Sequence, residues 1–547
     1  MPERLGDLKD SSYSRHVSAR FGDFVNPATP WPRRLWNVGT FLSLEELHEA
    51  GYWVDRRVLS QSAVDWLKHD MEELLGRETA LGSKDIRREL TATLKSDLTI
   101  RSDGRRRLRD IIDRSHTGYI ERWAHQVATE SPPDAEWASR AVVAHLLDSG
   151  HSMTGLRRWH SMHPGLSAVD LFTAAGALVS ASPTSFRMWV PVFELPAKID
   201  LDTVRNFVPA NKLNANVATV FQTNIKRAVI GSFEYNIVAR DAERAAEICA
   251  EVLDSIKSRL RFSPSKASRL TTAPRVFVED EKRFIDLKPY RRGVGLSSLL
   301  TAGELLNHQP LKNLAAKRNF VDDAFELAAP LVSGSTAPAI SGSWAALEAL
   351  LVDSRDSDQK EGKVVAAKNA ARIVACSWPR AELTTLSYQI DPKRLGGKEL
   401  VARLDQTTTN RARSEVIATH IREGGNLPLS RSWRIPSDSA AVTRMKKLVS
   451  DPSDVLERVS GYMESSFRRL YRCRNVIVHG GSTRGDVLDS SLRVSAPLVG
   501  AALDRIVHAN ISSGATPLML ATSADLSIQL ASDSEMGNGL TELLDRW

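Results

Sequence analysis

The sequence predicts a multidomain, mainly α-helical protein: a mostly helical N-terminal region, a small mixed domain and an all-helical C-terminal bundle. The chain has 547 residues, which at roughly 150 residues per domain indicates about three domains. Strand-like alternation is confined to the middle of the chain, whereas apolar residues at helical spacing recur on both sides of it. Hydrophobic residues make up 42% and charged residues 25%, which excludes disorder or a fibrous repeat over most of the chain.

The N-terminal region, residues 1–183, is predicted to be mostly helical. Helices are expected at 63–77 and 137–147, where apolar residues repeat at intervals of three and four. Between them lies a basic helical stretch, 84–114. It could present a phosphate-binding surface, although a solvated helix face is the commoner origin of such a pattern.

Residues 184–300 are predicted to form a small α/β or α+β domain. Strands are expected at 186–195, 232–239 and 275–278. A helix is expected at 242–260, with Asp241 as its N-cap. Pro191 interrupts the first strand pattern and argues for an edge strand or a bend there.

The C-terminal bundle is expected to span residues 305–515. Its helices are predicted at 311–331, 344–352, 362–376, 398–404, 413–422, 452–479 and 491–509, with breaks at 334–342 and 424–428. Residues 516–547 are predicted to be an acidic C-terminal tail.

Composition limits the partners and the compartment. The net charge of +7 permits an acidic partner such as nucleic acid but does not require one. Three widely separated cysteines exclude a disulfide scaffold and a four-cysteine zinc module. His151, His160 and His163 match no common zinc spacing, so no metal site is predicted. The N-terminus has no apolar core like that of a secretory signal, and no apolar run is long enough for a membrane span, so we expect a cytoplasmic protein.

The most informative segment is the predicted helix at 452–479. Asp451 can cap its first turn, Pro452 suits its first position, and Gly480 and Gly481 supply its end. Near that end lie Arg474, Asn475 and His479. Asn475 and His479 are four residues apart and share a face, and the long side chain of Arg474 can reach the same point.

These residue types suit one reaction. Cleavage of RNA by its own 2′-hydroxyl needs a base, an acid and a group that stabilises the negative charge on phosphorus. A histidine can be base or acid near neutral pH, and an arginine binds phosphate oxygens in a planar fork. The spacing alone is weak evidence for a site, because Arg140/His145 and Arg158/His163 share it. Arg474 and His479 differ in context, with an asparagine after the arginine and a glycine stop after the histidine.

The segment LYRCRNVIVHGG resembles the R-N-x-x-x-H motif of the HEPN superfamily of helical ribonucleases and toxins, in particular its Apea-like branch. The segment 343–351, SWAALEALL, resembles an early helix of the same domains, and Glu348 would be the polar residue that faces the motif. The resemblance covers roughly residues 305–515. It does not extend to the first 300 residues.

The resemblance implies a HEPN helical bundle of four or five helices that forms a homodimer through the motif helices. It implies a metal-independent endoribonuclease without a cofactor, of the kind found in toxin, abortive infection and antiviral defence systems. His479 would be base and acid, Arg474 would stabilise the transition state, Asn475 would orient the histidine or a phosphate, and Glu348 would hold Arg474.

Two further expectations concern RNA and regulation. Arg468, Arg469 and Arg472 would bind the RNA substrate, unless they are simply solvated. The N-terminal region would gate the nuclease, in response to a phage-derived trigger or a regulatory protein. The alternatives are a catalytically inactive HEPN module for RNA binding or dimerisation in a multi-protein complex, and a protein whose chemistry resides in the first 300 residues.

Overall fold

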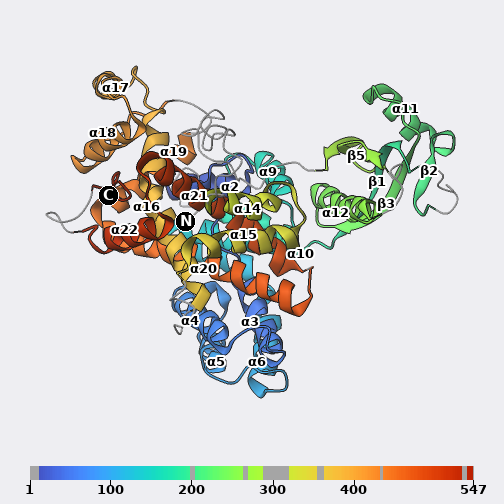
Figure 1. The fold of residues 1–547 in the computed structure, drawn as a ribbon, viewed down its shortest axis with the longest axis horizontal. Coiled ribbons are helices and arrows are strands. Elements are labelled where there is room, and N and C mark those ends of the chain that lie inside the picture. Colours follow the sequence, from blue (N-terminus) through green and yellow to red (C-terminus); the bar gives the residue numbers. More distant parts are fainter. Residues whose placement is uncertain are drawn as a thin grey trace, which may run out of the picture.

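The computed structural model of the chain describes residues 12–196, 204–262, 269–287, 320–353, 362–430, 435–483, 485–532 and 539–545. It is mainly helical, with one small antiparallel sheet (Figure 1). The sheet and its two helices stand to one side of a large helical body, which combines the N-terminal region with the C-terminal bundle (Figure 1).

The N-terminal region is helical, as predicted. Its helices are α2 (Ser12–Val25), α3 (Thr40–Asp55), α4 (Gln61–Arg77), α5 (Lys84–Leu94), α6 (Asp103–His116), α7 (Tyr119–Val127), α8 (Ala135–Asp148), α9 (Met153–Ser161) and α10 (Ala168–Ser180), with short turns η1 (Trp31–Arg33) and η2 (Thr79–Leu81). The basic stretch 84–114 forms two helices, α5 and α6. Arg109 and Arg114 there pair with Glu45 and Glu89, so this surface is partly neutralised.

The middle domain has an α+β fold, because all of its strand pairs are antiparallel. Its strands are β1 (Thr184–Glu194), β2 (Phe207–Pro209), β3 (Gly231–Ala239), β4 (Thr271–Thr272), β5 (Arg275–Val278) and β6 (Arg283–Asp286), in the order β2-β3-β1-β5-β6 with β4 also paired to β1. Two further helices are α11 (Ala215–Asn224) and α12 (Ala242–Arg261), with the turn η4 (Ala210–Lys212). Alternate residues of β1 face the two helices: Met188 packs with α12, and Trp189 packs with α11.

The expectation of an edge strand or bend at Pro191 is wrong in one respect, because β1 lies at the centre of the sheet. Pro191 lies opposite Ser232 of β3. On its other side the pairing with β5 has ended at Trp189 and the pairing with β4 begins at Val192. The missing N–H of proline therefore falls at a gap between two short partner strands.

The C-terminal bundle contains α14 (Phe320–Ser333), α15 (Thr336–Leu351), α16 (Val365–Ser387), α17 (Gly397–Asp405), α18 (Asn410–Arg422), α19 (Ile435–Ser450), α20 (Pro452–Gly480), α21 (Asp486–Ser513) and α22 (Pro517–Gln529), with the turn η6 (Gly362–Val364). Helix α20 packs against α15, α16, α19, α21 and α22. It is therefore the central helix of the bundle.

Three expectations for the bundle need correction. The predicted break at 334–342 is mostly helix, because α15 begins at Thr336. Helix α19 was not predicted. The predicted tail includes α22, whose Leu520, Ala521, Ala524 and Ile528 belong to the bundle core. Residues 305–319 of the predicted bundle, and 533–538 and 546–547 of the predicted tail, lie outside the described residues.

The N-terminal region and the bundle share apolar contacts. Trp36 belongs to the core of the bundle, and Val38 and Leu42 form a small cluster with Val494 of α21. Among the described residues, no helix is both long and apolar enough to cross a membrane.

Candidate active site at the end of helix α20

Local sequence sets both ends of α20. The Asp451 side chain accepts from the N–H of Asp454, and Pro452 occupies the first turn. At the other end Gly481 is left-handed, with φ of 69°, and its N–H donates to the carbonyl of Val476. This 29-residue helix carries its last polar side chain, His479, to an exposed end.

The structure brings Arg474, Asn475 and His479 together. Arg474 Nη1 donates to Asn475 Oδ1 over 3.0 Å and lies 3.2 Å from His479 Nε2. For this second contact to be a hydrogen bond, Nε2 must carry a lone pair, so the proton of the neutral ring is on Nδ1. The guanidinium of Arg474 thus lies between Asn475 and His479.

The three side chains differ in exposure. Asn475 is buried, Arg474 is half-buried and His479 is exposed. A buried anchor, a bridging cation and a solvent-facing imidazole allow a phosphate to approach from outside. Val478 beside them is 51% exposed, so this face of the helix end is open in the single chain.

Glu348 lies on α15, which packs against α20. Its Oε2 accepts a hydrogen bond from Nε1 of Trp344 over 3.0 Å, and the ring of Trp344 lies 4.8 Å from that of Tyr471 on α20. The hydrogen bonds of Arg474 go to Asn475 and His479. Glu348 therefore supports the packing of α15 on α20, and the expectation that it holds Arg474 is not what the structure shows.

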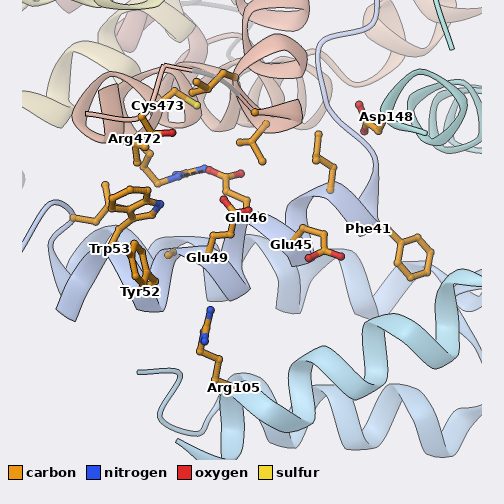
Figure 2. A pocket seen from close by; sticks show the side chains of 18 of the residues that line it. Phe41, Glu45, Glu46, Glu49, Tyr52, Trp53, Arg105, Asp148, Arg472 and Cys473 are labelled. Atoms are coloured by element: carbon orange, nitrogen blue, oxygen red, sulfur yellow. Dashed lines mark hydrogen bonds and ion pairs between the residues drawn. The ribbon is translucent and has the colours of Figure 1, made fainter. Parts of the chain in front are cut away.

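The three arginines expected to bind RNA are buried and paired. Arg468, Arg469 and Arg472 are only 8%, 5% and 3% exposed. Arg469 Nε lies 2.6 Å from one carboxylate oxygen of Glu46 on α3. Arg472 Nε lies 2.6 Å from the other (Figure 2). Arg468 pairs with Glu464 at 2.7 Å and covers the ring of Trp66 at 4.0 Å. The prediction is corrected: these guanidiniums fasten α20 to the N-terminal region and present no phosphate-binding surface.

Glu46, the partner of Arg469 and Arg472, was not predicted from the sequence. Burial alone would raise the pKa of this carboxyl, but the guanidiniums of Arg469 and Arg472 outweigh burial and hold its pKa below the ordinary value. Glu46 is therefore charged at neutral pH. No local pattern marks it, because 423 residues separate it from Arg469.

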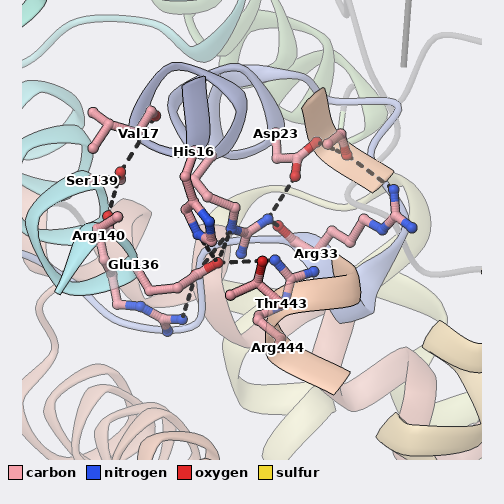
Figure 3. A network of polar contacts seen from close by, with 12 residues as sticks. His16, Val17, Asp23, Arg33, Glu136, Ser139, Arg140, Thr443 and Arg444 are labelled. Carbon is pink, nitrogen blue, oxygen red and sulfur yellow. Dashed lines mark hydrogen bonds and ion pairs between the residues drawn. The ribbon is translucent and has the colours of Figure 1, made fainter. Parts of the chain in front are cut away.

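A second buried network joins the N-terminal region to α16 and α19. Glu136 of α8 accepts from Arg444 (Figure 3) and from Arg20. Arg33 reaches Glu382 and Asp438. Burial would raise the pKa of Glu136, but Arg20 and Arg444 hold it well below the ordinary value. The N-terminal region is thus clamped to the bundle at two separate places.

The two other arginine–histidine pairs do not form comparable sites. His145 is buried against Phe41 and Tyr119, and burial lowers its pKa to about 3. His163 hydrogen-bonds through Nδ1 to the carbonyl of Trp159, within one helical turn. The burial of His145 and the local contact of His163 therefore distinguish these two pairs from Arg474 and His479.

Within the described residues, no group of three or more His, Cys, Asp or Glu side chains is arranged to hold a metal ion. Comparison of the chain with models of protein families, with curated proteins and with solved structures found no match.

Proposed function

We propose that this chain is a metal-independent endoribonuclease of HEPN type whose reaction centre is Arg474, Asn475 and His479. One observation carries the proposal: an arginine and an imidazole lie within 3.2 Å of each other at the exposed end of a long core helix. The motif resemblance and the helical packing around α20 support it.

We propose a role for each group. His479 Nε2 accepts the proton of the 2′-hydroxyl, O2′ attacks phosphorus, and the bond to O5′ breaks as that oxygen takes a proton from an acid. Arg474 turns from His479 to the non-bridging oxygens, whose negative charge grows in the transition state. Asn475 fixes the guanidinium through the 3.0 Å hydrogen bond. The products are a 2′,3′-cyclic phosphate and a 5′-hydroxyl.

One imidazole cannot easily stand on both sides of a phosphate. A homodimer with two-fold symmetry would supply a second His479 as the acid. The exposed surface around Val478 and His479 leaves room for such a pairing.

The first test uses purified full-length chain, an RNA oligonucleotide and a DNA oligonucleotide of the same sequence, in excess EDTA. We expect cleavage of the RNA and none of the DNA, because only RNA carries the nucleophile. Cleavage that EDTA abolishes and Mg²⁺ restores would contradict the mechanism.

We further propose that the N-terminal region gates this activity in a toxin or antiviral defence role. His479 is exposed, so the region does not act by covering it. Gating would act through α20 itself, because Arg469 and Arg472 tie two of its turns to Glu46.

The second candidate function is a catalytically inactive HEPN module. The burial of Arg468, Arg469 and Arg472 favours it, since a basic platform for RNA is missing from this part of α20. A folded dimer that neither binds nor cuts RNA would support a purely structural module.

A further inference from the structure

A cavity of about 720 Å³ lies between α3 of the N-terminal region and the junction of α20 with α21 (Figure 2). Its volume falls within the roughly 300–1,000 Å³ of small-molecule sites. Arg472, Cys473 and Val476 of α20 line it. At 100° per residue Arg472 and Val476 project about 160° away from Arg474. Arg474, Asn475 and His479 are not among the residues that line the cavity.

One end of the cavity has flat aromatic walls. Tyr52 and Trp53 of α3 line it, with ring centroids 4.9 Å apart. Trp53 also abuts α20, because a Cβ added at Gly480 would lie 2.7 Å from its ring. Such walls suit a planar ring that stacks on them.

Buried polar groups in the walls have unmet hydrogen-bonding capacity. Arg472 is only 3% exposed. Its Nε donates to Glu46, but its Nη2 has no hydrogen-bond partner among the described residues. His145, equally buried, contacts other rings, but none of the hydrogen bonds within the described residues involves its imidazole. Its pKa of about 3 keeps the ring neutral, with one donor and one acceptor.

The acidic groups in the walls are already paired. Glu45 binds Arg109, Glu46 binds Arg469 and Arg472, and Asp148 binds Arg493. These carboxylates can still accept from ligand N–H groups. Together with Glu49 they outnumber the guanidiniums of Arg105 and Arg472 in the lining, so the cavity disfavours a phosphate. The ligand should therefore be flat and uncharged, with carbonyl or ring-nitrogen acceptors for Arg472 and N–H donors for the carboxylates.

We propose that this cavity binds a nucleobase, stacked on Tyr52 or Trp53 and bonded to Arg472 Nη2, with any phosphate held outside. The base could belong to a free nucleoside or to an RNA strand. Because Trp53 abuts Gly480, a base stacked on Trp53 would lie next to the end of α20 that carries His479.

The test is calorimetric titration of the full-length chain with adenosine, guanosine, cytidine, uridine, their 5′-monophosphates and a short RNA. We expect at least one nucleoside to bind with a dissociation constant on the order of 10⁻⁴ M or tighter, and its monophosphate to bind no more tightly. Binding of the RNA alone, if lost in the variants below, would identify the strand as the source of the base.

Two variants and a control make the site specific. Tyr52→Leu removes one aromatic wall, and Ser149→Phe fills the cavity that Ser149 lines. Each should weaken binding by at least about tenfold. Tyr388→Leu is the matched control. Arg413 lies over the ring of Tyr388 as Arg56 lies over that of Tyr52, but Tyr388 is 61% exposed and does not line the cavity.

Helical content and melting temperature confirm that each variant is folded. No binding by any nucleoside or RNA, or equal binding by wild type and a folded Ser149→Phe chain, would overturn the proposal. Base binding without RNA cleavage would support this inference and count against the proposed nuclease. RNA cleavage without base binding at Tyr52 would support the nuclease and count against this inference.

Discussion

At the scale of the residue, the contacts of Arg474 provide a test of whether the planar guanidinium of arginine is needed, or only a positive charge. Arg474→Lys should retain a positive charge but lose the simultaneous contacts to Asn475 Oδ1 and His479 Nε2. We expect the rate of RNA cleavage to fall by roughly 10²-fold, a typical cost of losing one preorganised donor, with little change in stability because the side chain is half-buried.

Arg458→Lys on the same helix is the matched control, since Arg458 pairs on the surface with Asp454 four residues away. Its cleavage rate should equal that of wild type. Equal rates for Arg474→Lys and wild type would show that the fork is not used.

At the scale of the element, α20 depends on a carboxylate from outside the bundle. Glu46→Gln leaves Arg469 and Arg472 buried beside a neutral amide, so we expect the free energy of unfolding to fall by about 3–5 kcal/mol. Asp454→Asn removes an exposed pair on the same helix and should cost less than about 0.5 kcal/mol. Urea unfolding of the three proteins measures both values.

The same pair of variants predicts a pH dependence. Because the folded-state pKa of Glu46 is lowered, its stabilisation is complete above the ordinary value of about 4.3 and is lost as pH falls through the folded value. The gap in stability between wild type and Glu46→Gln should therefore shrink in acid. A gap that stays constant from pH 7 to pH 3 would contradict the lowered pKa.

Local signals explain which elements the sequence could predict. Asp451 and Gly481 act within a turn of the ends of α20, so its bounds follow from neighbouring residues. Helix α19 was missed because its buried face includes the small residues Ala440 and Ala441, which give a weak apolar pattern. The burial of Arg469 and Arg472 depends on Glu46, which no local pattern in the chain connects to them.

At the scale of the whole molecule, the N-terminal region and the bundle form one stabilised unit. Removing the region would leave Arg469 and Arg472 without Glu46. It would also remove Arg33 from Glu382 and Glu136 from Arg444, and would take Trp36 from the bundle core. We expect residues 305–547 expressed alone to lose cooperative unfolding, whereas the full chain unfolds the two parts together.

Calorimetry and proteolysis measure this difference. A fragment that melts cooperatively at the temperature of the full chain would show that the two clamps contribute little.

The central claim is that His479 carries the proton transfer in metal-free RNA cleavage. The most direct measurement is mass spectrometry of the RNA fragments made in EDTA by wild type, His479→Ala and the control His163→Ala, whose imidazole contacts the backbone carbonyl and the ring of Trp159. We predict 2′,3′-cyclic phosphate ends from wild type and His163→Ala, and a rate about 10²- to 10⁴-fold lower for a folded His479→Ala chain. Undiminished cleavage by His479→Ala, or fragments with 5′-phosphate ends, would contradict the account.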